Sequence, residues 1–231
     1  ERKKPVVAIY STFLQRAYDQ LIHDVAVQNL DVTFALDRSG LVGEDGPTHS
    51  GNYDIAYLRC IPNMVICTPS DENETRKLLT TAYLHNGPAS VRYPRGTGPN
   101  SNVDKDLKPL KIGEANIINE ESSEIVILNF GTLLNEANQI SKELKATLVD
   151  MRFVKPLDEK LLRKLFKKAK VFISIEDGSI MGGAGSAVQE FASKENLNVR
   201  SILFGIPDKF IEHASREEML VEAGLDAENI K

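Results

Sequence analysis

The sequence has few cysteines, no surplus of positive charge and no long apolar run, and each absence excludes a class of protein. The two cysteines, Cys60 and Cys67, show no metal-binding or redox spacing and lie in or beside apolar runs. We therefore expect buried, reduced thiols in a cytoplasmic protein. A net charge of −5 argues against a general nucleic-acid-binding protein, and no segment has the character of a membrane span or a signal peptide.

An initiator methionine is also absent. Glu1-Arg2-Lys3-Lys4 leads at once into an apolar run at residues 5–9. On this pattern we expect the chain to be a piece of a longer protein.

What is present is an ordinary globular composition, 42% hydrophobic and 26% charged over 231 residues. Apolar runs of strand length alternate with segments of helical spacing. The expected strands lie at 6–10, 32–36, 64–67, 89–92, 125–128, 147–150, 171–175 and 199–204. The expected helices lie at 11–25, 70–83 with Ser70 as N-cap, 131–144, 157–168, 183–195 and 216–223. This alternation predicts an α/β fold of two doubly wound, mostly parallel sheets.

A change of composition divides the chain. The stretch from Gly96 to Asn102 is rich in Gly, Pro and Asn and is typical of a linker. We expect a first domain at 1–95, a linker at 96–112 and a second domain at 113–231.

One loop is too long and too rich in glycine to be a plain connection. It runs from Asp37 to Asn52, and such loops in compact domains are usually functional. Glycines there allow the backbone to approach a ligand closely. Asp45 and His49 are titratable groups within it. His49 is either a solvated or hydrogen-bonded side chain or a catalytic one, and the sequence leaves both open.

Arginines gather where the first strands end. Ligands of open α/β sheets bind beyond the carboxyl ends of the strands. The first strand ends at Tyr10, the second runs into Arg38, and the fourth runs into Arg92 and Arg95. Arginine forks suit a phosphate or a carboxylate, so we expect an anion site. The alternative is that Arg38 and Arg92 pair with carboxylates of the protein, of which the candidates are Asp37, Glu44 and Asp54.

Two further residues lie near the same edge. Phe13 and Arg16 fall in the first turns after the first strand. Phe13 is either a core residue or a stacking platform for a flat ring.

Two features of the second half have structural interpretations. The stretch from Met181 to Ser186 is glycine-rich but lacks the context of a dinucleotide loop, so we interpret it as close helix–strand packing or an interface turn. Glu176 and Asp177 end a strand. Because adjacent side chains on a strand point apart, we expect salt-bridge or interface roles for them.

Seven motifs, taken together, resemble the 1-deoxy-D-xylulose-5-phosphate synthase family of transketolase-like enzymes, and the resemblance covers nearly the whole chain. They lie at 9–20, 37–40 with 45–51, 57–62, 68–74 and 91–96 in the first half and at 180–186 and 205–208 in the second. The resemblance implies an enzyme that condenses pyruvate with D-glyceraldehyde 3-phosphate and releases carbon dioxide. This reaction feeds non-mevalonate isoprenoid synthesis as well as thiamine and pyridoxal phosphate synthesis. The cofactors implied are thiamine diphosphate and Mg²⁺, and the assembly is a homodimer.

The resemblance also implies residue roles. Phe13 would stack on the aminopyrimidine ring of the cofactor. The phosphate of glyceraldehyde 3-phosphate would be held by Tyr10, Arg38 and Arg95. The reacting centre would be lined by Arg16, His49 and Asp45. Arg92 has no role in this assignment.

The chain departs from the family in what it lacks. The family's diphosphate- and magnesium-binding domain, and the glutamate that activates the aminopyrimidine, precede the segment matched here, so we expect no metal ligands in this chain. Two alternatives stay open for the polypeptide alone. It is either half of an active site that a missing N-terminal segment completes, or a catalytically inert binding and dimerisation module. Another transketolase-like activity is the remaining alternative.

Overall fold

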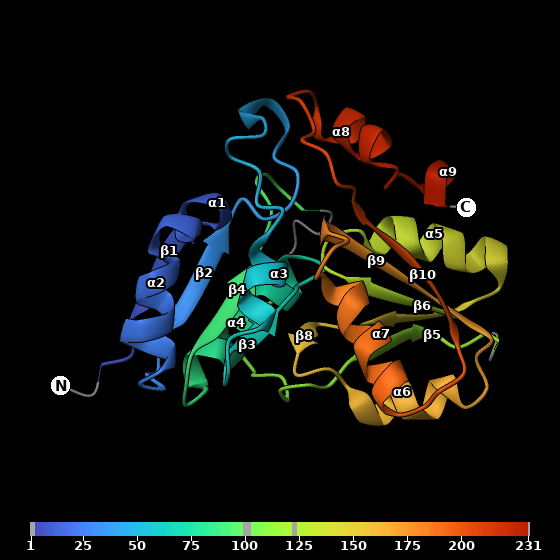
Figure 1. Ribbon diagram of the computed structural model, residues 1–231, viewed down its shortest axis with the longest axis horizontal. Helices are drawn as coiled ribbons and strands as arrows, with labels where there is room; N and C mark the ends of the chain where they lie inside the picture. The colour runs from blue at the N-terminus through green and yellow to red at the C-terminus, as the bar shows by residue number, and fades with distance from the viewer. Residues whose placement is uncertain (1–2, 99–102, 122–123, 231) are drawn as a thin grey trace.

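The computed structural model describes residues 3–98, 103–121 and 124–230, which form two five-stranded sheets side by side (Figure 1). Part of the predicted linker, residues 99–102, lies outside the described residues. Both sheets are mostly parallel, so the predicted fold class is confirmed.

The first sheet has the strand order β1-β2-β4-β3-β8. Its parallel strands are β1 (Val6–Tyr10), β2 (Thr33–Asp37), β4 (Ala89–Arg92) and β3 (Val65–Cys67). The fifth strand, β8 (Phe153–Lys155), comes from the second half of the sequence and runs antiparallel to β3. The sequence pattern did not predict β8, because three residues are too few to show a period. This strand ties the two halves of the chain together.

The helices of the first half depart from expectation in three places. The predicted helix after β1 is a succession of short pieces: α1 (Ser11–Leu14), a 3₁₀ turn (Gln15–Ala17), α2 (Tyr18–Gln20) and a π-helical turn (Leu21–Ala26). The helix α3 (Asp54–Arg59) was not predicted. The helix α4 (Glu72–Leu84) is capped by Asp71, whose side chain accepts the Glu74 N–H at 2.8 Å, and the predicted cap Ser70 was wrong.

The second sheet has the order β10-β9-β6-β7-β5. Its strands are β10 (Arg200–Ile206), β9 (Val171–Ser179), β6 (Ile125–Phe130), β7 (Thr147–Asp150) and β5 (Asn116–Asn119). Among these five strands only β5 runs antiparallel. It was not predicted, because it is half-exposed and its two asparagines leave no apolar run of strand length. The helices of this half are α5 (Leu134–Leu144), α6 (Glu159–Phe166), α7 (Ala184–Lys194), α8 (Arg216–Ala223) and α9 (Ala227–Ile230).

One apolar core runs across both halves. It joins Leu36 and Ile55 of the first half to Phe130 and Val188 of the second. Helix α3 lies between the two sheets (Figure 1) and contacts β9 of the second and β3 and β8 of the first. The two sheets therefore meet through a packed interior, and the ends of their strands are held in a fixed relation.

The two cysteines have different environments. Cys67 is buried, and burial raises the pKa of its thiol, as expected for an inert core residue. Cys60 is exposed, so its predicted burial was wrong. It follows α3, where the chain turns at the surface. Among the described residues, no helix has the length and apolar character needed to cross a membrane.

Candidate functional site

The carboxyl ends of β1, β2 and β4 meet at one edge of the first sheet, as the strand-end rule predicts. The register pairs Tyr10 with Asp37 and Leu36 with Arg92. Beyond the strands, the Tyr93 N–H donates to Leu36 O and the Ser39 N–H donates to Tyr93 O, both at 3.0 Å. The two segments that carry the predicted arginines are thus joined by backbone hydrogen bonds.

At this edge two arginines share one carboxylate. Arg38 Nε donates to Asp45 Oδ2 at 2.9 Å, and Arg95 Nε lies 3.3 Å from the same oxygen. The Arg38 guanidinium also lies over the Tyr10 ring, 4.0 Å from its centroid. We call Tyr10, Arg38, Asp45 and Arg95 the outer arginine cluster. The structure brings together all three residues predicted to hold a phosphate.

The Arg38–Asp45 ion pair of the outer cluster is partly open to solvent. The hydrogen bond from Arg38 lowers the pKa of Asp45, and the same bond raises the pKa of Arg38. Arg38 has a left-handed backbone with φ of 57°, and Asp37 supports it by accepting the Arg38 N–H at 2.7 Å and Nη1 at 3.1 Å. The pairing of Arg38 with Asp37, which the sequence left open, is therefore present.

Aromatic rings extend the cluster on one side. Phe13 stacks on Tyr10 with ring centroids 5.1 Å apart and planes at 16°. His49 approaches Phe13 edge-on at 5.6 Å, and His49 Nδ1 lies 2.9 Å from Thr48 Oγ1 in a hydrogen bond. Phe13 is 46% exposed, so its interpretation as a core residue was wrong. The stacking platform remains as the alternative.

Arg16 stands apart from these side chains. It is exposed on the 3₁₀ turn that follows α1. Within residues 3–98, 103–121 and 124–230, no hydrogen bond or ion pair joins it to the outer cluster. The structure therefore brings six of the seven predicted site residues into one group and leaves Arg16 beside it.

The loop 37–52 is glycine-rich because it passes close to the second half of the chain. A Cβ on Gly40 would lie 2.6 Å from Asp177 Oδ2, and one on Gly46 would lie 3.1 Å from His213 Cβ. In Figure 1 this loop stands beside the segment that leads into α8. The close approach that was predicted for a ligand is an approach to protein atoms.

A second cluster lies buried beneath the first. Arg92 Nε donates to Asp54 Oδ2 at 3.0 Å, and Arg92 Nη1 donates to Asp177 Oδ1 at 2.5 Å. We call Asp54, Arg92 and Asp177 the inner arginine cluster. Burial acts to lower the pKa of Arg92, but the charges of Asp54 and Asp177 outweigh it and raise that pKa above its usual value.

The inner cluster settles two predictions. Arg92 pairs with Asp54, as the alternative to an anion site proposed, and Asp177 has the predicted salt bridge. Its neighbour Glu176 points the other way and accepts the N–H groups of Ala184 and Gly185 at the start of α7. A Cβ on Gly185 would lie 2.3 Å from Ser174 Oγ, which confirms close helix–strand packing.

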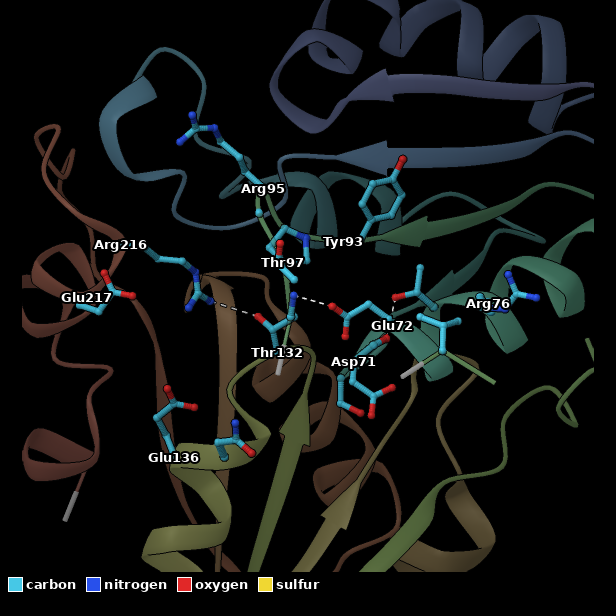
Figure 2. Close-up of a pocket in the computed structure, with 17 residues that line it drawn as sticks. Asp71, Glu72, Arg76, Tyr93, Arg95, Thr97, Thr132, Glu136, Arg216 and Glu217 are labelled. Carbon is cyan, nitrogen blue, oxygen red and sulfur yellow. Dashed lines mark hydrogen bonds between the residues drawn. The ribbon is translucent and has the colours of Figure 1, made fainter. Parts of the chain in front are cut away.

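A cavity of about 680 Å³ opens between the two sheets (Figure 2). It is lined from the first half by α4 residues such as Glu72 and Arg76, and from the second by Thr132, Glu136 and Arg216. Arg216 Nη2 donates to Thr132 Oγ1 at 3.1 Å. Of the outer arginine cluster, only Arg95 lines this cavity. Because the other predicted site residues lie at the cluster, we place the candidate site there and not in the cavity. Among the described residues, no group of three His, Cys, Asp or Glu side chains is placed to hold a metal ion.

Comparison with protein families finds two matches in chain order. Residues 1–100 match the transketolase pyrimidine binding domain, and residues 113–230 match the transketolase C-terminal domain. The second match covers about half of the chain.

Whole proteins give consistent results. The chain is 60% identical over 231 residues to a 1-deoxy-D-xylulose-5-phosphate synthase of Pseudomonas paraeruginosa, and 61% identical over 232 residues to one of Stutzerimonas stutzeri. All of this chain is covered, but only 37% and 36% of those proteins. A solved structure described as a split gene transketolase, an inactive β4 tetramer, superposes with a TM-score of 0.86 at 26% identity, covering 99% of this chain and 73% of that one.

Proposed function

The chain belongs to the transketolase family, and we propose that it is part of a 1-deoxy-D-xylulose-5-phosphate synthase. In that role it supplies the half of the active site that binds the triose phosphate and the pyrimidine ring of the cofactor. The substrates of the whole enzyme would be pyruvate and D-glyceraldehyde 3-phosphate, and carbon dioxide would be released.

The observation that carries this proposal is the outer arginine cluster at the strand ends. Arg38 and Arg95 both point at Asp45 Oδ2, and a phosphate oxygen is an acceptor of the same charge sign. A triose phosphate would take over those bonds and release Asp45. The Tyr10 ring lies against the Arg38 guanidinium, and its hydroxyl is a further hydrogen-bond donor for a phosphate. Charge-assisted bonds of this kind contribute about 1.5–3 kcal/mol each.

The fit of the cofactor rests on Phe13. One face of its ring lies on Tyr10, and 46% of the residue is exposed, so a flat heterocycle has an aromatic surface to stack on. When bound, thiamine diphosphate supplies the nucleophilic carbon for decarboxylating pyruvate and joining the remaining two carbons to the aldehyde. On the family resemblance, Mg²⁺ and the diphosphate would be held by the part of the enzyme that precedes the segment matched here.

The chain's own residues then have separate tasks. Arg38, Arg95 and Tyr10 fix the phosphate end of the substrate. We assign to His49, which is edge-on to Phe13 and hydrogen-bonded to Thr48, the movement of a proton to or from a substrate hydroxyl. Asp45 contributes to the polar surroundings of His49, and the role of Arg16 at the reacting centre rests on the family resemblance alone.

A second candidate concerns the polypeptide by itself. The chain spans a little over a third of the synthases that it matches. The split gene transketolase that shares its fold is described as inactive and as a β4 tetramer. We propose that the isolated chain is likewise inactive and self-associates, and that an N-terminal segment of the same enzyme completes the site.

The test is complementation. The chain is co-expressed with the N-terminal part of the Pseudomonas paraeruginosa synthase, giving what we call the complemented enzyme. We expect no 1-deoxy-D-xylulose 5-phosphate from the chain alone and clear product from the complemented enzyme. Product from the chain alone would contradict the half-site. A stable complex that binds thiamine diphosphate but makes no product would contradict the proposed synthase activity.

A further inference from the structure

We propose that Arg92 is a positioning residue which, with Asp54 and Asp177, sets the geometry of the outer arginine cluster from the second half of the chain. This inference rests on the proposed function, because it concerns how the triose phosphate site is held. It assigns a task to a residue that the family resemblance leaves without one.

The first step is the connection between Arg92 and Arg95. Arg92 is the last residue of β4, and Arg95 follows three positions later. Arg92 Nε lies 3.2 and 3.0 Å from the two oxygens of Asp54, so its side chain is fixed against the start of α3. The end of β4, from which Arg95 projects, is therefore anchored by a charge-assisted bifurcated hydrogen bond.

The second step connects the same anchor to Arg38. Ser39 Oγ donates to Asp54 Oδ2 at 3.1 Å and also lies 3.2 Å from Leu36 O. Ser39 is the residue after Arg38, and its N–H donates to Tyr93 O. Asp54 thus holds the segments that carry both arginines of the outer cluster.

The third step brings in the second sheet. Asp177 lies two residues before the end of β9 and accepts a hydrogen bond from Arg92 Nη1, and its Oδ2 accepts one from Thr132 Oγ1 at 3.2 Å. Asp177 also lies directly under Gly40, where an added Cβ would meet its backbone oxygen at 2.9 Å. Gly40 and Gly51 exchange backbone hydrogen bonds at 2.8 and 2.9 Å. The contact between Gly40 and Asp177 therefore fixes the distance between the loop 37–52 and the second sheet.

Arg92 itself does not have the geometry of a ligand-binding group. Only 3% of its side chain is exposed. Each of its guanidinium nitrogens donates to the protein: Nε to Asp54, Nη1 to Asp177, and Nη2 to Gly51 O at 3.3 Å and Asp177 O at 3.4 Å. It can therefore affect the substrate only through the residues that it holds.

The experiment compares Asp177→Asn with Arg95→Ala and wild type in the complemented enzyme. Asp177→Asn keeps the shape of the side chain and removes its charge. We expect the KM for glyceraldehyde 3-phosphate to rise about tenfold, because displaced binding groups lose most of their effect, while the KM for pyruvate changes less than about twofold. The matched control is Leu162→Ala in α6, a buried residue whose truncation lowers stability far from the cluster.

The outcomes separate the two proposals. If Arg95→Ala leaves the KM for glyceraldehyde 3-phosphate unchanged, the proposed function fails. If Arg95→Ala raises it but Asp177→Asn behaves like Leu162→Ala, only the positioning inference fails. Thr132→Val serves as a milder second variant should Asp177→Asn not fold. It removes the bond to Asp177 together with the bond from Arg216, and we expect a rise of about twofold to threefold that is again confined to the phosphorylated substrate. Equal changes for both substrates in Thr132→Val would overturn the inference.

Discussion

The outer and inner arginine clusters both pair arginine with aspartate, and Arg92 of the inner cluster is only three positions before Arg95 of the outer one. In the outer cluster, two arginines share the carboxylate of Asp45, and the side chains of Arg38 and Arg95 are 21% and 43% exposed. In the inner cluster, two carboxylates share Arg92, and no side chain is more than 3% exposed. The outer arginines can exchange partners with a dissolved anion, whereas every donor of Arg92 is enclosed by protein. Burial is therefore the physical ground on which we propose a binding role for the outer arginines and a positioning role for Arg92.

The two clusters also differ in what they contribute to stability. Exposed ion pairs contribute between zero and about 1 kcal/mol, because solvent screens them. Removing one partner of a buried pair costs about 3–5 kcal/mol, because the other charge is left uncompensated. Variants at the two clusters should therefore separate binding from folding.

The largest expected effect is on folding. Arg92→Met leaves Asp54 and Asp177 buried without a cation, and we expect the free energy of unfolding to fall by about 3–5 kcal/mol. Arg95→Met should lower it by less than about 1 kcal/mol. Urea denaturation of the isolated chain followed by circular dichroism measures both. Equal losses in the two variants would remove the distinction between the clusters.

The next effect is on turnover. His49→Ala in the complemented enzyme should lower kcat about a hundredfold or more, as expected for the loss of a proton-transferring group, with little change in either KM. Steady-state kinetics at saturating substrates measures it. Unchanged turnover would show that His49 is a solvated loop side chain, and a binding role alone would then remain for the outer arginine cluster.

Substrate binding comes third. We expect Arg38→Ala or Arg95→Ala to raise the KM for glyceraldehyde 3-phosphate about tenfold to a hundredfold and to leave the KM for pyruvate nearly unchanged. Varying one substrate at a time in the complemented enzyme gives both constants. Similar increases for the two substrates would break the assignment of these arginines to the phosphate.

The smallest expected effect is at Asp150, a buried carboxyl group to which no arginine side chain of the described residues donates a hydrogen bond. Burial raises the pKa of Asp150 to about 7, although the hydrogen bond from Ser70 lowers it. The folded protein then binds more protons than the unfolded chain between about pH 4 and pH 7, so the free energy of unfolding falls as the pH rises through this window. The slope for one proton is at most about 1.4 kcal/mol per pH unit. Asp150→Asn should remove that contribution, and denaturation of both proteins at pH 5 and pH 7 measures it. A parallel dependence in the two proteins would show that Asp150 does not titrate there.

The sequence predicted most of the parallel strands and the edge of the sheet where the arginines meet, because apolar runs and strand ends are local features. It did not predict β8, whose three residues have no readable period, or the role of Asp177, which depends on how a second sheet approaches Gly40. The glycines of the loop 37–52 are visible in the sequence, but their close contacts are not, since Gly40 lies against Asp177 and Gly46 against His213, both in the second half of the chain. Strand-end reasoning also grouped Arg92 with the outer arginines, because position on a strand does not reveal burial.

The assignment of the outer arginine cluster to the triose phosphate is tested most directly by comparing two substrates in the complemented enzyme. They are D-glyceraldehyde 3-phosphate and D-glyceraldehyde, which lacks the phosphate. The ratio of kcat/KM for the two substrates measures how much the protein gains from the phosphate. We predict that the double variant Arg38→Ala/Arg95→Ala lowers this ratio about a hundredfold or more, while kcat/KM for D-glyceraldehyde changes little. A ratio that stays at the wild-type value, with both substrates impaired equally, would contradict the assignment of the outer arginine cluster to the triose phosphate.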